Sequence, residues 1–334
     1  MLASRPHRPR PGPARRSLGL VVLLTASPLL PAQTLEDIRE ELRGSLREVH
    51  FAQSLMGLVL LAEELELSGA RYSLDNPEDT DLTVYAMPFH TSKPVWGEDR
   101  PRLHLEGAFG YAEARESVAD FYGGALPGLE TEVRTKWRTY GGLLGAGIEF
   151  PVATGWTVTP ILDVGLSRIE NDTNYGGPGA AVTAALADGI AFNWDAMAFT
   201  YGGAGRVDWK RSLDEHHKLE VVGRYDVRWT ETFAEDDTAQ DFVARSQLIT
   251  LHGEMVGPTG FDWSGRKVDW QLSAAYRVFP EGTLFGVDDY VQIGGGLLVY
   301  TGDRLPVGKG FAVNAAYMFA PDFEGWTVGF RMLF

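Results

Sequence analysis

From Gly69 to the C-terminus, hydrophobic and polar residues alternate in long segments that are separated by clusters of turn-forming residues. The clearest segment, 267–278, carries one apolar face and one polar face. The apolar face is Val268, Trp270, Leu272, Ala274, Tyr276 and Val278, and the other is Lys267, Asp269, Gln271, Ser273, Ala275 and Arg277. Because successive side chains of a strand point to opposite sides, this alternation predicts an all-β fold.

Two all-β architectures share this pattern, a soluble sandwich and an outer-membrane barrel. Sandwich strands usually run about five or six residues, whereas strands that cross a membrane run to about ten or more. Tryptophans lie near the ends of the predicted strands, as in the aromatic belts of membrane barrels: Trp137, Trp156, Trp194, Trp209, Trp229, Trp270 and Trp326. Trp137 and Trp194 fall on the polar face of the alternation, so a bulge or a shifted strand boundary is expected beside them.

The segments predict a 12-stranded antiparallel transmembrane β-barrel. The strands are expected near 69–75, 80–89, 101–112, 136–151, 156–170, 194–211, 217–233, 241–256, 267–280, 288–301, 309–320 and 324–334. An even number of strands returns both chain ends to the periplasm. The two longest connections, 113–135 and 171–193, then lie outside the cell, while the inner turns 90–100 and 257–266 are longer than usual. Segment 241–256 does not alternate, and we expect a bulge or a misplaced strand boundary there.

The N-terminus has the order of regions found in a secretory signal. Residues 1–17 contain five arginines and no acid, and the apolar run Leu18 to Thr25 follows, then Pro28, Pro31 and Ala32. We expect cleavage after Ala32. The expected organisation is therefore a signal peptide over 1–32, a helical segment over 33–68 and an outer-membrane barrel over 69–334.

The segment before the barrel has helical rather than strand periodicity. Its apolar positions are Leu35, Ile38, Leu42, Leu46 and Val49, and charged residues occupy the other side. At about 1.5 Å per residue, a helix over 34–65 would be roughly 48 Å long. Such a helix could thread the barrel lumen as a plug or lie in the periplasm, and both alternatives stay open.

Composition narrows the class of protein further. The chain has 30 Lys and Arg against 45 Asp and Glu, a net charge of -15, and removal of the five signal arginines makes it -20. A nucleic-acid-binding face is therefore not expected. The absence of cysteine excludes disulfides and thiolate metal sites. The apolar stretch Leu55 to Ala62 is far shorter than the roughly 20 residues of a membrane-spanning helix, so any membrane residence must come from strands.

The end of the chain carries the most specific pattern. Trp326, Val328, Phe330, Met332 and Phe334 share one face, and Phe334 is the last residue. This ending resembles the terminal strand that the barrel assembly machinery of the outer membrane reads. Together with the helical segment and the opening strand, the sequence over 69–334 resembles the solitary outer-membrane autotransporter-type barrels. Residues 33–68 are too few for the long β-helical passenger of typical autotransporters, so passenger display is not expected.

Charged residues also occur on the polar faces that would line the lumen: Glu106, Glu149, Asp163, Arg224, Asp226, Arg228, Asp269, Arg277 and Arg331. Charges in a poorly hydrated interior must be paired. We interpret them as an internal ionic network that fixes the barrel, with a selectivity device as the alternative. Glycines within the strands, Gly141, Gly142, Gly145, Gly147 and Gly294 to Gly296, indicate strand bends or a close approach of the helix.

A catalytic role finds little support among the titratable residues. An outer-membrane lipid hydrolase needs a serine hydrogen-bonded to a histidine near the outer leaflet. His104, His216, His217 and His252 are all expected toward the periplasmic end, and His90 in a periplasmic turn. Lipid hydrolysis would become plausible again if His104 reached a serine at the outer rim.

The remaining candidates are read as structural residues. Asp236 and Asp237 lie in an outer loop without a histidine, and we expect solvated acids. His216 and His217 are adjacent and would point apart, so we expect turn residues rather than metal ligands.

The sequence therefore predicts an integral outer-membrane barrel that is not an enzyme and has no cofactor, catalytic residue or metal site. It would act as a structural or surface-exposed module. The alternatives are a porin-like channel for small solutes and, less favoured, a lipid hydrolase. The expected partners are outer-membrane lipid, lipopolysaccharide and the barrel assembly machinery, with no nucleic acid, and the protein is expected to be monomeric.

Overall fold

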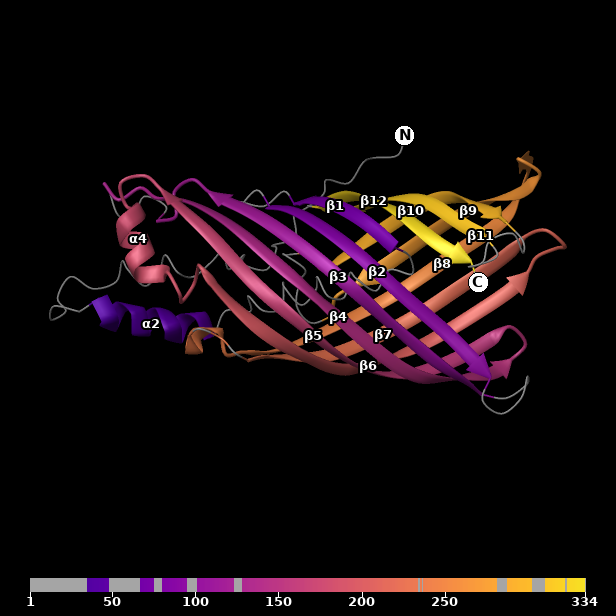
Figure 1. Cartoon of the computed structure of the whole chain (residues 1–334), viewed down its shortest axis with the longest axis horizontal. Coiled ribbons are helices and arrows are strands. Elements are labelled where there is room, and N and C mark those ends of the chain that lie inside the picture. The colour runs from indigo at the N-terminus through magenta and orange to yellow at the C-terminus, as the bar shows by residue number, and fades with distance from the viewer. Residues whose placement is uncertain are drawn as a thin grey trace, which may run out of the picture.

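The chain forms a closed barrel of twelve antiparallel strands, as the alternation predicted (Figure 1). The computed structural model describes residues 35–47, 67–74, 80–94, 101–122, 128–233, 235, 237–280, 287–301, 310–321 and 323–333. The strands are β1 Leu67–Leu74, β2 Thr80–Pro94, β3 Arg102–Val118, β4 Glu132–Ala153, β5 Trp156–Gly176, β6 Trp194–Ser212, β7 Lys218–Phe233, β8 Val243–Trp263, β9 Arg266–Val278, β10 Asp289–Tyr300, β11 Gly310–Ala320 and β12 Phe323–Leu333. Each pairs with its neighbours in sequence, and β1 pairs with β12. Because the first and last strands pair, no strand of the described barrel is an edge strand.

The outer surface of the barrel is apolar over its middle. On β5, for example, Leu162, Val164 and Leu166 point outward and are exposed, whereas Ile161 and Asp163 point inward and are buried. The outward apolar residues and the inward Asp163 have the orientation that the alternation predicted, although the apolar Ile161 also faces inward. In a soluble sandwich the apolar face would instead be covered by a second sheet.

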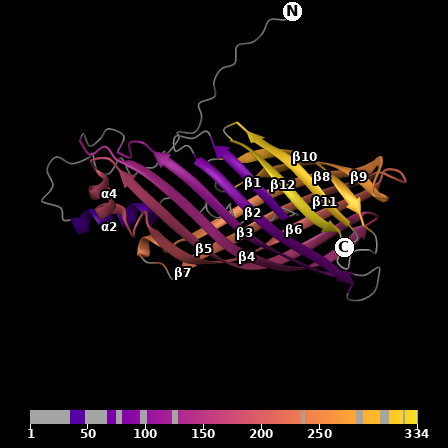
Figure 2. The ribbon, with the colours of Figure 1, turned by 45° about the horizontal axis from the view of Figure 1, so that its top comes forward.

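The two ends of the barrel differ. The β5–β6 connection carries α4 (Ala180–Ala187), the β7–β8 connection carries η1 (Thr238–Gln240), and α2 (Leu35–Arg47) lies against both (Figures 1 and 2). We call this the helix-bearing end. At the opposite end, the hairpin end, β4 and β5 are joined by two residues, as are β8 and β9. Gly155, Ser264 and Gly265 adopt positive φ angles of 78°, 52° and 73° there, which suits tight hairpins.

The wall of the barrel has unequal height. β4 and β5 contain 22 and 21 residues, whereas β1 contains 8 and β12 contains 11. The wall formed by β3 to β6 therefore projects toward the helix-bearing end. Both long outer connections are shorter than expected, because β3 continues to Val118, β4 begins at Glu132 and β5 continues to Gly176.

Of the two explanations for the failed alternation of 241–256, the misplaced strand boundary is correct, because β8 extends to Trp263. The alternative, a bulge within 241–256, is absent where β8 pairs with β9, since their register runs without a shift from Ile249 to Pro258 and the shift follows between Pro258 and Phe261. The predicted long turn 257–266 is mostly strand. Alternation fails in this segment because Leu248 is apolar and faces the lumen, while Arg245 faces outward.

The helical segment is described only over Leu35–Arg47. The rest of the predicted helix, the predicted signal peptide and Phe334 lie outside the described residues. Within the described part of the chain, no helix is long and apolar enough to cross a membrane.

Candidate functional site in the barrel lumen

The half of the lumen toward the helix-bearing end is apolar. Trp137 and Trp194 both point inward and are buried, with ring centroids 5.6 Å apart in an edge-to-face arrangement. Around them lie further buried residues from β1, β5, β8, β10, β11 and β12: Tyr72, Ile169, Leu248, Tyr290, Met318 and Phe323. We call this cluster the apolar section. Both tryptophans therefore lie inside the barrel and not in an outer aromatic belt. The bulge or boundary shift expected beside them is not required to explain their position.

The lumen nearer the hairpin end is charged, and glycines make this arrangement possible. In the strand register, Glu106, Gly145, Asp163, Gly202 and Arg228 follow one another across β3 to β7. A Cβ atom on Gly202 would lie 2.8 Å from Cγ of Arg228, and one on Gly145 would lie 3.0 Å from Cγ of Glu106. The glycines therefore leave room for long charged side chains to pass over the neighbouring strands.

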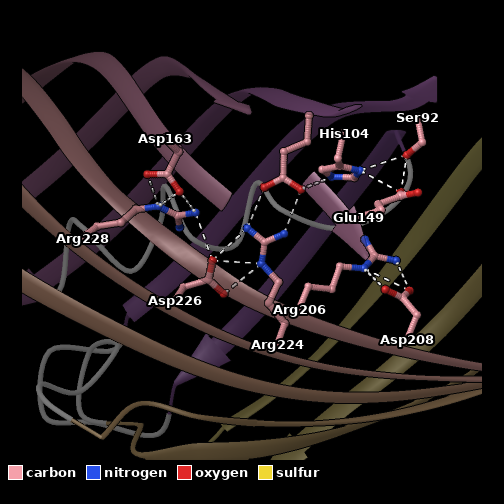
Figure 3. Close-up of polar contacts among 10 residues, drawn as sticks. Ser92, His104, Glu149, Asp163, Arg206, Asp208, Arg224, Asp226 and Arg228 are labelled. Atoms are coloured by element: carbon pink, nitrogen blue, oxygen red, sulfur yellow. Dashed lines mark hydrogen bonds and ion pairs between the residues drawn. The ribbon is translucent and has the colours of Figure 1, made fainter. Parts of the chain in front are cut away.

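Arg228 passes over Gly202 and reaches Asp163 on β5 (Figure 3). Its Nη2 donates to Oδ2 of Asp163 at 2.9 Å and to Oδ1 of Asp226 at 3.1 Å, and its Nε faces both Asp163 oxygens at 3.1 Å. The three side chains are at most 1% exposed. Since an unpaired buried charge is strongly destabilising, this group ties β5 to β7.

A second arginine on β7 crosses the lumen. Arg224 donates to both carboxylate oxygens of Glu106 on β3, at 2.9 and 2.8 Å, and to both oxygens of Asp226, at 2.9 and 3.0 Å. Two-point contact between a guanidinium and a carboxylate is directional as well as strong. β3 and β7 share no backbone pairing, so this ion pair joins distant parts of the wall.

His104 extends the charged group toward the hairpin end (Figure 3). Its Nε2 lies 3.0 Å from Oε2 of Glu106, and its Nδ1 lies 3.3 Å from Oε1 of Glu149 and 3.1 Å from Oγ of Ser92. Ser92 also donates to Glu149. A serine is therefore within reach of His104, but at the hairpin end and not at the other rim. The single hydroxyl proton of Ser92 is donated to Glu149 rather than to His104, so this geometry does not prepare the serine as a nucleophile.

Six of the nine predicted lumen charges form one connected group, and the other three make separate contacts. Glu106, Glu149, Asp163, Arg224, Asp226 and Arg228 belong to the group just described. Across the lumen, Arg331 donates to Glu254 at 3.2 Å and to Gln271 at 3.1 Å. Arg277 donates to Tyr290 at 3.2 Å and to Gln292, and Asp269 lies beside Tyr300.

Sequence reasoning missed several members of these groups. Glu254 was passed over because its segment does not alternate. Ser92 and the ion pair of Arg206 with Asp208, 2.7 Å apart, were not singled out. The only available signal was that all of them lie on the inward phase of their strands.

The loop and turn candidates are placed as follows. Asp237 is not a solvated acid: Nε of Arg43 donates to its oxygens at 3.2 and 3.1 Å, and Asp237 caps η1. Asp236 lies outside the described residues. His217 Nδ1 bonds Asp214 at 2.8 Å, and His90 lies within β2 rather than in a turn. No group of three or more potential ligand side chains is placed to hold a metal in the described ranges.

Outside the barrel, five tyrosines form a row toward the helix-bearing end, which we call the tyrosine girdle. Each donates its hydroxyl to an acid that lies further toward that end. The pairs are Tyr111 with Glu113, Tyr140 with Glu170, Tyr201 with Glu231, Tyr276 with Asp289 and Tyr317 with Glu324, at 2.7 to 2.9 Å. Toward the hairpin end, Trp156 lies beside Trp209, with their ring centroids 6.0 Å apart and their planes tilted. Aromatic rows on both sides of an apolar band are typical of the two membrane interfaces.

The predicted assembly strand is the outward face of β12. Trp326, Val328, Phe330 and Met332 all point outward and are exposed. Phe334 lies outside the described residues, so its role stays a prediction.

A closed barrel with an apolar outer band and two aromatic rows has the architecture of transmembrane β-barrels. Residues 69–295 match the family described as the solitary outer membrane autotransporter beta-barrel domain, and the chain belongs to that family. The predicted family resemblance is thereby confirmed. A comparison with curated protein sequences found no match.

Solved structures with similar folds include autotransporter translocators. The translocator domain of NalP from Neisseria meningitidis is 12% identical with a TM-score of 0.51, and the match covers 88% of this chain and 97% of that one. The transport unit of AIDA-I from Escherichia coli is 12% identical with a TM-score of 0.48, covering 89% and 99%. The β domain of the Bordetella autotransporter BrkA is 16% identical with a TM-score of 0.46, covering 80% and 96%. At these identities, the similarity to NalP concerns the fold alone.

Proposed function

We propose that this protein is a non-catalytic outer-membrane barrel that holds its own N-terminal segment at the outer mouth, as a translocator-like module without a large passenger. The observation that carries the proposal is the attachment of α2 to two connections at the helix-bearing end. In this proposal the helix-bearing end faces outward from the cell and the hairpin end faces the periplasm.

Two arginines and one leucine attach α2. Arg39 donates to the backbone oxygens of Ala185 at 2.7 Å and Asp188 at 3.2 Å, at the C-terminal end of α4, where a cation is favoured. Arg43 bonds Asp237, and its pKa is raised, first by the hydrogen bond to Glu36 and then by that to Asp237. Leu42 packs against the small cluster of Val133, Ala187 and Phe192.

The predicted lumen plug is part of the proposal. Residues 48–66, which include the apolar stretch Leu55 to Ala62, lie outside the described residues. The described lumen contains the apolar section, a surface that matches an apolar segment of chain. We therefore propose that the N-terminal segment closes the lumen.

Surface labelling of introduced cysteines tests the proposed orientation. Because the sequence contains no native cysteine, the introduced thiol is the only one that can react. Glu40 on α2 is 76% exposed, so Glu40→Cys should react with a membrane-impermeant maleimide on intact cells. Glu215→Cys, in the exposed hairpin-end turn between β6 and β7, is the matched control and should react only after permeabilisation. The reverse labelling pattern would overturn the proposal.

The barrel assembly machinery is the proposed partner during insertion, and the expected mature start after Ala32 stays a prediction. Deletion of Phe334 should lower the amount of barrel that shows heat-modifiable mobility in membranes. Phe311, on the outward face of β11, offers a control through Phe311→Leu, which alters the outer face but keeps the chain end. Unchanged mobility in the deletion strain would show that insertion does not depend on recognition of Phe334 by the assembly machinery.

A further inference from the structure

We propose that the surface on which α2 lies, at the helix-bearing end (Figure 1), binds an arginine-bearing amphipathic helix of another polypeptide, more cationic than α2, in place of α2. This arginine-binding surface consists of the backbone oxygens of Ala185, Leu186 and Asp188 and the carboxylate of Asp237. The inference rests on the proposed function in one respect, because it extends the attachment of α2 to a helix that is supplied in trans.

The first half of the arginine-binding surface is the C-terminal end of α4. Gly189 has a φ angle of 73°, and its N–H donates to the oxygen of Phe192 rather than to that of Ala185, which would continue the helix. The oxygen of Ala185 is therefore left to a donor from outside α4, and Nη1 of Arg39 takes this position at 2.7 Å. Because this oxygen lies at the negative end of the helix dipole, a cation is favoured there.

The second half is Asp237 on η1, and one glutamine fixes it relative to α4. Gln240 is buried, its Nε2 donates to the oxygen of Gly189 at 2.9 Å, and its Oε1 accepts from the backbone N–H of Asp237 at 3.0 Å. The carboxylate of Asp237 also accepts from the N–H of Ala239 at 2.9 Å. None of these hydrogen bonds involves α2, so the barrel's own connections hold both halves in place. A surface that is preorganised in this way avoids part of the entropy cost of binding.

The two halves fit two arginines that are one helical turn apart. Arg39 and Arg43 are separated by four positions, about 6 Å along a helix axis. Arg39 reaches two backbone oxygens through Nη1 and Nη2, at 2.7 and 3.2 Å, and Nε of Arg43 lies 3.1 Å from Oδ2 of Asp237. Several donors in one plane suit these acceptors better than the compact ammonium of lysine. With Leu42 partly buried on the same face, the surface selects the pattern Arg-x-x-Leu-Arg.

α2 itself is not the most favourable occupant. Nη1 of Arg43 donates to Glu36 at 2.8 Å and to Glu40 at 3.0 Å, so two acids of α2 share this guanidinium with Asp237. The side chains of both acids are more than two thirds exposed. The arginine-binding surface consists only of hydrogen-bond acceptors, and like charges repel each other. A helix with neutral or basic residues at the two acidic positions keeps both arginine contacts and lowers this repulsion, which favours a more cationic ligand than α2.

Fluorescently labelled peptides provide the test, with the full chain from residue 33 in detergent. The barrel variant R39A/R43A removes the contacts of α2 and keeps the arginine-binding surface, so a peptide of residues 35–47 should bind to it. Adding D237N should weaken binding about tenfold, because a charge-assisted contact is lost. Adding D241N instead, at a nearby exposed acid, is the matched control and should leave binding unchanged. The wild-type barrel should bind the peptide more weakly than R39A/R43A, since α2 competes at a high effective concentration.

Three peptide variants decide the ligand chemistry. The peptide E36Q/E40Q should bind several-fold more tightly than the wild-type peptide, R39K/R43K several-fold more weakly, and R39Q/R43Q should show no binding. Circular dichroism corrects the affinities for helix content, and heat-modifiable mobility verifies that the barrel variants are folded. Equal binding by the barrels with and without D237N would overturn the site. An equal or lower corrected affinity of the E36Q/E40Q peptide would overturn the ligand class. If Glu40→Cys labels from outside and no peptide binds, this inference fails and the proposed function stands.

Discussion

The apolar section and the charged section of the lumen share some of their strands but are built by opposite chemistry. Near the hairpin end, Arg228 on β7 forms an ion pair with Asp163 on β5 across Gly202 of β6. Nearer the helix-bearing end, Trp137 on β4 and Trp194 on β6 present apolar surface to the lumen. The charged section joins strands of the wall through ion pairs, whereas the apolar section joins them through the packing of buried apolar side chains. Two regions of one barrel are therefore held together by different interactions.

The largest effect is expected in the charged section. Arg228→Met leaves Asp163 buried without its ion-pair partner and removes one of the two arginines that contact Asp226, and removal of one member of a buried ion pair costs about 3 to 5 kcal/mol. Urea unfolding in detergent should show this loss in the free energy of unfolding. The double variant D163L/R228M should recover most of it, because no charge is stranded.

The matched control for this variant is an exposed ion pair on the outer wall. Arg71 lies 3.4 Å from Asp81, and both side chains are more than half exposed. Arg71→Gln should change the free energy of unfolding by less than about 1 kcal/mol. If Arg228→Met had an effect as small as Arg71→Gln, the charged section would not fix the wall.

A smaller loss is expected in the apolar section. Trp137→Ala removes the edge-to-face contact with Trp194 and leaves a cavity, and such truncations cost about 3 kcal/mol or somewhat more. Trp263→Ala, which removes an exposed tryptophan near the hairpin end, is the control and should have little effect. Equal losses from the two variants would mean that the apolar section is not packed.

The smallest effect belongs to the hairpin-end turn, outside both sections. The pKa of Asp214 is lowered to about 2, first by the hydrogen bond from the backbone N–H of His216 and then by the side chain of His217. A lowered pKa adds stability above the ordinary value of 3.8, and this stability is lost as the pH falls through about 2. Asp214→Asn should therefore flatten the pH dependence of unfolding between these values. Glu215→Gln, at the neighbouring acid, should leave it unchanged.

The sequence predicted the outer face of the barrel better than its lumen. Alternation locates residues such as Leu272 and Tyr276 correctly, because lipid requires an apolar outer surface along the whole strand. It fails at Trp137 and Leu248, since it assumes that the lumen is polar throughout. The ion pairs could not be predicted from the sequence for another reason. Asp163 and Arg228 are 65 positions apart, and only the register of three strands brings them together.

The attachment of α2 to the barrel also could not be predicted from the sequence. Asp237 had the features of a solvated loop acid, and its partner Arg43 lies almost 200 positions earlier in the chain. Helical periodicity indicated that residues around Leu42 form a helix, but not which surface that helix contacts. Only the three-dimensional arrangement of α4 and η1 identifies that surface.

Conductance in planar bilayers tests most directly whether the N-terminal segment closes the lumen. The chain that starts at residue 33 should show no steady current, whereas the chain that lacks residues 33–66 should conduct, because the proposed plug is then removed. Arg39→Ala with Arg43→Ala, which releases α2 but keeps residues 48–66, should give brief openings at most. A steady open pore in the complete mature chain would contradict the account and favour a channel for small solutes.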